Sequence, residues 1–227
     1  AQHSFSTNYS IVANYTWSKC LNNADPQGDI SGSQLSNPNK PWVDYGPCGS
    51  DIRNNTNIYM ALMSQFPIHG ITGYLVNNWE LAPLLRIVTS TPVNVSEGQD
   101  ESFTANGGDR PNLVPGVNPY LKTKIRSNHG GAVYATQSWL NQAAFTLNTV
   151  PGTQGEISRN SFRGPIYFQN DAQLTRIFPI HENFNLKLRL EAFNFLNHPS
   201  FSNPSSGGPH FTGGSFGEIT GTSVGGR

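Results

Sequence analysis

The sequence has little charge and little sulfur. Asp, Glu, Lys and Arg together make up 12% of its 227 residues, and the formal net charge is zero. That charged share is about half of what a soluble domain usually carries. A neutral chain is not drawn by its overall charge toward nucleic acid or an acidic membrane surface, so we expect no nucleic-acid partner.

Long hydrophobic runs are also absent. No stretch of about 18 apolar residues occurs, which excludes a transmembrane helix. The first residues do not have the pattern of a secretory signal peptide. Neither absence excludes a membrane, because a strand of a membrane barrel exposes only every second residue to lipid and therefore has a weak hydropathy signal.

The polarity comes instead from Asn, Ser, Thr and 23 Gly residues, a composition typical of strands, turns and loops. Residues 5–17 alternate with a period of two, which predicts a strand. The apolar positions on one face include Phe5, Tyr9, Ile11, Tyr15 and Trp17. Thirteen residues exceed the usual globular strand of about 5–6 residues and suit a tilted membrane strand of about 9–11.

Four more strands are predicted, over residues 51–66, 78–95, 166–178 and 184–195. Pro83 lies inside the third predicted strand, where it has no N–H to donate, so we expect a bulge there. Residues 179–182 are predicted to form a tight turn. In the last strand the apolar face holds Phe184, Leu186, Leu188, Leu190 and Ala192.

The connections between these strands alternate between long and short. Residues 97–165 have no clean period and are expected to form one very long loop without structure of its own. Outer-membrane barrels combine short periplasmic turns with long extracellular loops. We therefore predict an all-β fold, an antiparallel transmembrane β-barrel with long extracellular loops, of which about five strands are present.

Several short phrases, spread in order over nearly the whole chain, match one known family. They are Asn14-Tyr15-Thr16-Trp17-Ser18-Lys19, Asp109-Arg110-Pro111-Asn112, Trp139-Leu140-Asn141, Ala144-Phe145, Ser158-Arg159-Asn160, Arg163-Gly164-Pro165, Glu191-Ala192-Phe193-Asn194-Phe195-Leu196-Asn197-His198-Pro199 and Phe216-Gly217-Glu218-Ile219-Thr220. In their order and spacing the chain resembles the C-terminal part of the Oar-like TonB-dependent receptors of acidobacteria.

The resemblance implies a barrel of about 22 strands with a plugged lumen. It also implies a bacterial outer-membrane location, an N-terminal plug and a segment that contacts the TonB complex. On this reading residues 1–227 are the C-terminal portion of the receptor barrel, truncated at both ends and lacking the plug. The implied partners are the lipid bilayer, TonB through the absent N-terminal parts, and an unidentified solute.

The two cysteines flank the first long loop. Cys20 follows the first predicted strand and Cys48 precedes the second, and these points lie close together in an antiparallel pair. The periplasm and the cell surface are oxidising. We predict a disulfide at the base of the loop, which stabilises by about 3 kcal/mol in the chain-entropy model; two unrelated free thiols are the alternative.

Lys187, Arg189 and Glu191 form the densest charged cluster, on the face of the last strand opposite its leucines. On the lipid side an Arg or Lys at the bilayer midplane costs about 2–4 kcal/mol. We therefore expect these three side chains to face the lumen. Solvation in the lumen with cross-strand pairing is a simpler role for them than a solute-binding site.

No catalytic, cofactor-binding or metal site is predicted. Ser215 fits the G-x-S-x-G pattern, but that motif needs a strand before it and a helix after it, and both flanks are rich in Gly and Ser. The six histidines lack the spacing of zinc ligands. We therefore expect that the chain is not an enzyme, and a hydrolase that uses Ser215 is the weakest of the alternatives.

The sequence thus favours part of a TonB-dependent outer-membrane receptor that takes up a scarce solute. Its strands would supply barrel wall and lumen surface, and its long connections would be extracellular loops. The main alternative is a secreted all-β module that binds carbohydrate or acts as an adhesin, with a second sheet covering the apolar faces. The chemical class of the solute is left open.

Overall fold

The structure is a computed structural model. It describes residues 2–6, 8–24, 35–37, 39–105, 108–121, 138–181, 184–205 and 211–223, with side chains described from residue 8 onward. The chain divides into two compact units. The sheet unit comprises Ala1–Trp17, Asn54–Val88 and Tyr167–His198, and the loop unit comprises Ser18–Arg53, Thr89–Ile166 and Pro199–Arg227.

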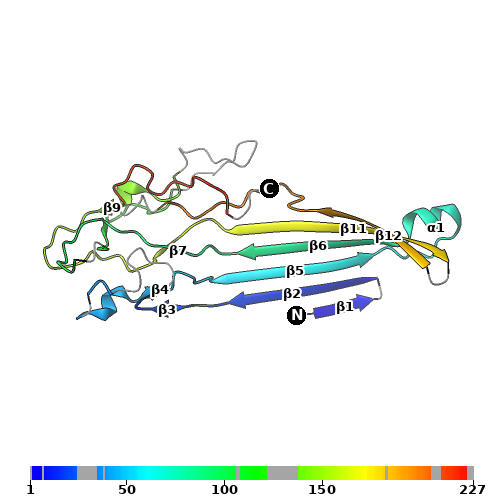
Figure 1. Ribbon diagram of the computed structural model, residues 1–227, viewed down its shortest axis with the longest axis horizontal. Coiled ribbons are helices and arrows are strands. Elements are labelled where there is room, and N and C mark those ends of the chain that lie inside the picture. The colour runs from blue at the N-terminus through cyan, green and yellow to red at the C-terminus, as the bar shows by residue number, and fades with distance from the viewer. Residues whose placement is uncertain are drawn as a thin grey trace. The chain divides into compact units, whose positions relative to one another are not determined.

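The sheet unit is one antiparallel sheet of six strands (Figure 1). Neighbours along the sheet are β1 (Gln2–Ser6), β2 (Tyr9–Trp17), β5 (Asn54–Met63), β6 (Trp79–Val88), β11 (Tyr167–His181) and β12 (Phe184–Ala192). The prediction of an antiparallel, all-β fold is confirmed. Among the described residues the sheet is open, because β1 and β12 do not pair with each other.

The prediction of a single strand over residues 5–17 is wrong. The structure divides it into β1 and β2, which pair as a hairpin with Gln2 opposite Val12 and Ser6 opposite Tyr9. Asn8, a residue that favours turns, lies in the turn between them. The alternation of polar and apolar residues continues through this turn, so the sequence pattern did not reveal it, and the sheet has six strands where about five were predicted.

Two other local predictions also need correction. No bulge occurs at Pro83. The register of β5 against β6 is the same at Tyr59–Leu84 and at Leu62–Leu81, and the two strands are simply not paired between these positions. Pro83 still pairs with Ala172 of β11 on its other side. The tight turn predicted at residues 179–182 begins too early in the prediction. Strand β11 continues to His181, with an irregular register after Pro179.

The connection between β5 and β6 contains the short helix α1 (Gly70–Val76). Asn77 fixes this connection: its side chain accepts a hydrogen bond from the Phe66 N–H at 2.6 Å and donates to the Phe66 carbonyl at 3.0 Å. Gly73 is required by close packing, because a Cβ there would lie 2.0 Å from the Ile68 carbonyl oxygen. The connection is therefore a closed and specifically bonded turn.

The loop unit is built from very short elements. They are β3 (Leu21–Asn22), η1 (Pro41–Asp44), β4 (Gly46–Pro47), β7 (Pro92–Val93), β8 (Asn112–Leu113), η2 (Gln142–Ala144), β9 (Phe145–Thr146) and β10 (Phe162–Arg163). A hydrophobic core that includes Val95, Leu140 and Phe145 lies inside this unit. The prediction of long loops without structure of their own is wrong for the described parts of these segments.

None of the helices in the described part of the chain combines the length and the apolar character needed to cross a membrane. Nor do the described residues gather three or more His, Cys, Asp or Glu side chains into a group that could hold a metal ion.

Candidate membrane-facing surface and loop-unit core

Apolar side chains form continuous rows across the sheet unit. Residues directly opposite each other on paired strands project to the same face, so the register shows which side chains share a side. One row crosses five strands through the pairs Tyr9–Leu62, Leu62–Leu81, Leu81–Leu174 and Leu174–Leu190. Every member is at least 37% exposed. This row defines the apolar face of the sheet.

Polar side chains form rows on the opposite side, the polar face. One such row runs through the pairs Asn14–Asn57, Asn57–Arg86 and Arg86–Gln169. The neighbouring row, one residue further along each strand, lies on the apolar face and consists of Tyr15, Thr56, Ile87 and Phe168. The period of two is therefore in phase from strand to strand, and the sheet has one apolar and one polar side.

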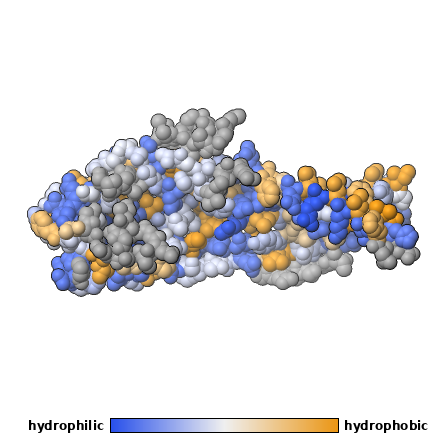
Figure 2. Space-filling view, in the orientation of Figure 1, coloured by the Kyte–Doolittle hydropathy of each residue, from blue (hydrophilic) through white to orange (hydrophobic). Residues whose placement is uncertain are grey.

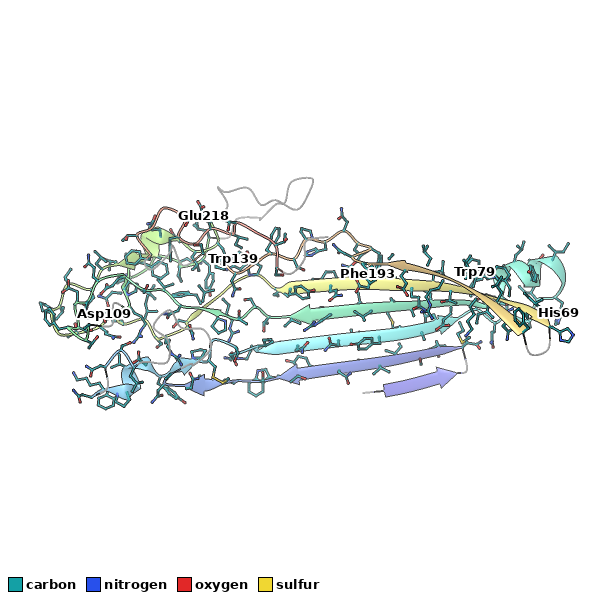
Figure 3. All side chains as sticks on the ribbon, in the orientation of Figure 1. His69, Trp79, Asp109, Trp139, Phe193 and Glu218 are labelled. Carbon is teal, nitrogen blue, oxygen red and sulfur yellow. A yellow bond between two sulfur atoms is a disulfide. The ribbon has the colours of Figure 1, made fainter. Side chains whose placement is uncertain are left out.

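Aromatic residues mark both ends of the apolar face. At the end where β2 finishes, Tyr15 and Trp17 are 64% and 65% exposed. Trp79 and Phe184 occupy the other end, where β6 and β12 begin, and Figure 3 labels Trp79 near α1. Aromatic girdles at both interfaces flank the apolar band of outer-membrane barrels. Hydrophobic side chains also reach the surface of the sheet unit in Figure 2.

The structure places Lys187, Arg189 and Glu191 on the polar face of β12. Their partners on β11 are Ile177, Thr175 and Gln173. An ion pair joins Arg189 Nη1 to Glu191 Oε1 at 3.7 Å, with both side chains about half exposed. Among the described residues Lys187 has no ion pair. The cluster is a solvated charged strip whose ion pair lies within β12, so the described residues do not show the cross-strand pairing expected for it, and its lumen-facing position stays a prediction.

A disulfide joins Cys20 to Cys48 in the structure, with the two Cα atoms 5.4 Å apart. The backbone is paired at the same place, since the Cys48 N–H donates to the Cys20 carbonyl at 3.1 Å. The Cys20 N–H donates to Asp51 Oδ1 at 2.7 Å. The bridge therefore closes the first long connection at its base, where the two β-strands β3 and β4 also pair.

The core of the loop unit is aromatic. Phe145 makes edge-to-face contacts with Phe162 and Phe216, with ring centroids 5.3 Å and 5.2 Å apart. Phe211 packs against both Phe145 and Phe216. These residues come from positions far apart in the sequence, and each is at most 5% exposed. Figure 3 shows the loop unit filled with side chains in the region of Asp109, Trp139 and Glu218.

Three arginines connect distant segments of the loop unit, and two of them, Arg110 and Arg159, are buried. Arg110 Nη1 binds Asp44 Oδ1 at 2.9 Å, and both side chains are less than 5% exposed. The same guanidinium donates to the Ile157 carbonyl at 3.0 Å. Arg159 donates to the Asp44 carbonyl at 3.0 Å, and Arg163 pairs with Asp51. The buried charges of Arg110 and Arg159 are ion-paired or hydrogen-bonded, as buried charges must be, and the partly exposed Arg163 is paired with a buried carboxylate.

Two buried carboxyl groups of the loop unit have opposite pKa shifts. Burial raises the pKa of Asp51, but the Cys20 N–H and the Arg163 guanidinium outweigh it, so the net pKa is lowered. Burial raises the pKa of Glu97; the hydrogen bond from the Asn148 N–H lowers it in part, and the nearby Asp109 and Glu101 charges raise it, so the net pKa is raised. Glu97 Oε1 has no hydrogen-bond partner among the described residues.

The family phrases quoted from the sequence now have structural roles. Asp109, Arg110, Leu140 and Arg159 are each at most 2% exposed and hold the loop unit together. In the phrase that spans residues 191–199, Asn194 and Asn197 have positive φ angles and turn the chain after β12. His198 packs edge-to-face on Phe168, with ring centroids 5.2 Å apart.

The hydrolase motif lacks its structural context. Ser215 lies in a run of turns, with its carbonyl accepting from the Glu218 N–H at 3.2 Å. Among the described residues no strand leads into it and no helix follows it. The described geometry around Ser215 is that of a surface turn.

Sequence reasoning missed Arg176 of β11. It belongs to the apolar face, opposite Trp79 and Leu188, yet it is only 3% exposed. Its guanidinium lies over the rings of Trp79 and Phe178, with 5.2 Å and 5.1 Å to the centroids. The only sequence signal was a charge at an apolar position of a predicted strand, and nothing in the sequence identified the cover that buries it.

Comparison with protein families matches residues 1–227 to the outer membrane beta barrel domain. The chain belongs to this family. No curated protein and no solved structure matches the chain.

Family membership places the protein in the bacterial outer membrane, with membrane lipid as its partner. The apolar face accordingly needs no second sheet to cover it, because lipid does so. The alternative of a secreted soluble module does not agree with this location. The sheet strands other than β1 are also long enough: β2 and β12 have 9 residues, β5 and β6 have 10 each and β11 has 15, against about 9–11 for a membrane strand, whereas β1 has 5.

Proposed function

We propose that the chain is part of a TonB-dependent receptor of the Oar-like type, which imports a scarce solute across the outer membrane. In this role the sheet unit supplies barrel wall with the polar face toward the lumen, including Lys187, Arg189 and Glu191. The loop unit lies outside the cell. TonB supplies the work through parts of the receptor other than these residues, and no residue here is catalytic.

The observation that carries the proposal is the unequal length of the connections. The long ones, residues 18–53 and 89–166, start at Trp17 and Val88, which the register places at one end of the sheet together with Asn54 and Tyr167. Long extracellular loops and short periplasmic turns are the arrangement of outer-membrane barrels. A folded, disulfide-closed loop unit of this size suits a receptor that recognises a solute outside the cell.

The family phrases add a second line of support, because they recur here in the order found in Oar-like receptors. The lumen of the complete barrel would be filled by the plug, as in the large outer-membrane transporters. A simple diffusion pore is the competing function within the same family. The two differ in whether an aqueous channel is open at rest.

Two measurements on the complete parent protein separate these functions. In a planar bilayer the receptor is expected to show almost no steady ion conductance, whereas a diffusion pore conducts continuously. The periplasmic domain of TonB is expected to retain the receptor in a pull-down from detergent extract. Steady conductance together with no retention by TonB would contradict the proposal.

A further inference from the structure

The short helix α1 is attached to the apolar side of the sheet. Tyr74 of α1 packs against Phe178 of β11, with ring centroids 6.5 Å apart. The register pairs Phe178 with Leu186, which lies on the apolar face of β12. Because Phe178 and Leu186 share that face, α1 covers part of the surface that the rest of the sheet presents to lipid.

Arg176 fastens α1 in this position. Its guanidinium donates to the Tyr74 carbonyl and lies 5.5 Å from the centroid of the Tyr74 ring. Trp79 adds a second bond, since its Nε1 donates to the Leu75 carbonyl at 2.8 Å. The helix therefore buries Arg176, a cation on the apolar face, and the orientation of the helix is fixed by these contacts.

The outer surface of the connection is strongly apolar. Ile71 is 82% exposed and Leu75 is 62% exposed, and they lie four positions apart on one side of α1. Phe66 and Ile68, which precede the helix, are 55% and 44% exposed. Residues 66–76 contain no Asp, Glu, Lys or Arg. In water such a surface would be costly, and no described residue of the sheet unit covers it.

We propose that α1, together with Phe66 and Ile68, is an interfacial anchor that lies at the boundary of headgroups and acyl chains in the membrane leaflet at the short-turn end of the sheet. Its partner is phospholipid. The apolar surface of the anchor continues the apolar face, which is the lipid contact of the barrel wall. Interfacial helices bury their apolar side by about 5–10 Å in that boundary.

Site-specific fluorescence in phospholipid vesicles tests the anchor. An environment-sensitive probe is attached to Ile71→Cys in the complete parent protein, reconstituted with phosphatidylethanolamine and phosphatidylglycerol. Asn185→Cys is the matched control, because it lies at the same end of the sheet on the polar face of β12. Nitroxide on the acyl chain near the headgroup serves as the lipid quencher, and iodide serves as the aqueous quencher.

The expected result is lipid quenching roughly threefold stronger at position 71 than at position 185, given a depth of about 5–10 Å, and iodide quenching in the opposite order. Strong iodide quenching at position 71 would overturn the proposal in favour of a water-exposed turn. Protection of position 71 from both quenchers would overturn it in favour of a protein partner or a second copy. Neither outcome depends on TonB, so the proposed transport is tested separately.

Discussion

Leucine side chains meet opposite surroundings in the two units. Leu140 of the loop unit is 1% exposed, whereas Leu188 and Leu190 of the sheet unit are 65% and 66% exposed. Among the described residues Val88 is the only buried hydrophobic residue that belongs to the sheet unit. The loop unit carries its own core, and the sheet unit depends on lipid to take its apolar side chains out of water.

The two units also treat charge differently. The loop unit buries Arg110 with Asp44 at less than 5% exposure, whereas Arg189 and Glu191 of the sheet unit form a half-exposed pair. Buried pairs are sensitive to the loss of one partner, and exposed pairs contribute little. The loop unit is thus stabilised like a water-soluble domain and the sheet unit like a membrane protein. Substitutions of the same kind should therefore have different effects in the two units.

The largest effect is expected for Arg110→Leu. Removing the guanidinium leaves the Asp44 carboxylate buried without its partner, which costs about 3–5 kcal/mol. Arg189→Leu is the matched control and should cost at most about 1 kcal/mol, because its pair is exposed. Hydrogen exchange of the two variants measures both. Equal protection of the loop-unit amides in the two variants would show that the buried pair does not hold this unit together.

Reduction of the disulfide is expected to have the next largest effect. The bridge closes a loop with a sequence separation of 28 residues, which stabilises by about 3 kcal/mol in the chain-entropy model. Mass spectrometry of non-reduced peptides should find Cys20 linked to Cys48 in oxidised cell envelopes. Cys20→Ser should weaken hydrogen-exchange protection in the loop unit and leave β12 unchanged. Recovery of both cysteines as free thiols would exclude the bridge.

A third prediction compares neighbouring residues on β12. Leu188→Arg places a charge on the apolar face and should cost about 2–4 kcal/mol if the site is near the midplane. Arg189→Leu loses at most one pairing of roughly 0.2–1 kcal/mol. Reversible unfolding of the complete barrel in lipid gives both values. If Arg189→Leu were the more damaging change, the faces of the whole strand would be inverted, because a slip of one residue exchanges them.

The smallest effect is expected from pH. Since the pKa of Glu97 is raised above its ordinary value of 4.5, its stabilising contribution is complete below that value and is lost as pH rises through the raised pKa. Glu97→Gln should therefore reduce the loss of loop-unit stability as pH rises above 4.5. Hydrogen exchange across this range measures it, and an unchanged slope would argue against a titrating Glu97.

Asp51 provides the opposite case. Its pKa is lowered below the ordinary value of 3.8, so its contribution is present above that value and is lost as pH falls through the lowered pKa. Asp51→Asn should destabilise the loop unit at neutral pH and remove part of its sensitivity to acid below about pH 4. A variant that matched the parent at neutral pH would contradict the role of the Asp51–Arg163 pair.

The strands and their faces were predictable because their cause is local. In β12 the alternation of Leu186, Leu188 and Leu190 with Lys187, Arg189 and Glu191 is visible in the sequence, and it is the alternation that the structure has. The turn at Asn8 was not predicted, because the alternation of polar and apolar residues continues through it. The pairing of Cys20 with Cys48 followed from the antiparallel neighbours on either side of one loop.

The loop unit was not predictable because its contacts are distant in the sequence and follow no period. Phe145 meets Phe211 and Phe216, and Arg110 reaches Asp44 across 66 positions. The sequence around an arginine does not identify the aspartate with which it forms an ion pair. The same applies to Arg176, whose burial depends on α1, a helix of seven residues too short to give a helical period.

The central claim is that one face of the sheet contacts lipid and the other contacts water. Nitroxide scanning of residues 185–190 of β12, in the complete protein in bilayers, tests it most directly. Collision with oxygen, which concentrates in lipid, should peak at positions 186, 188 and 190, and collision with a water-soluble nickel complex should peak at 185, 187 and 189. Peaks of both reagents at the same positions, or the reverse assignment, would contradict the account.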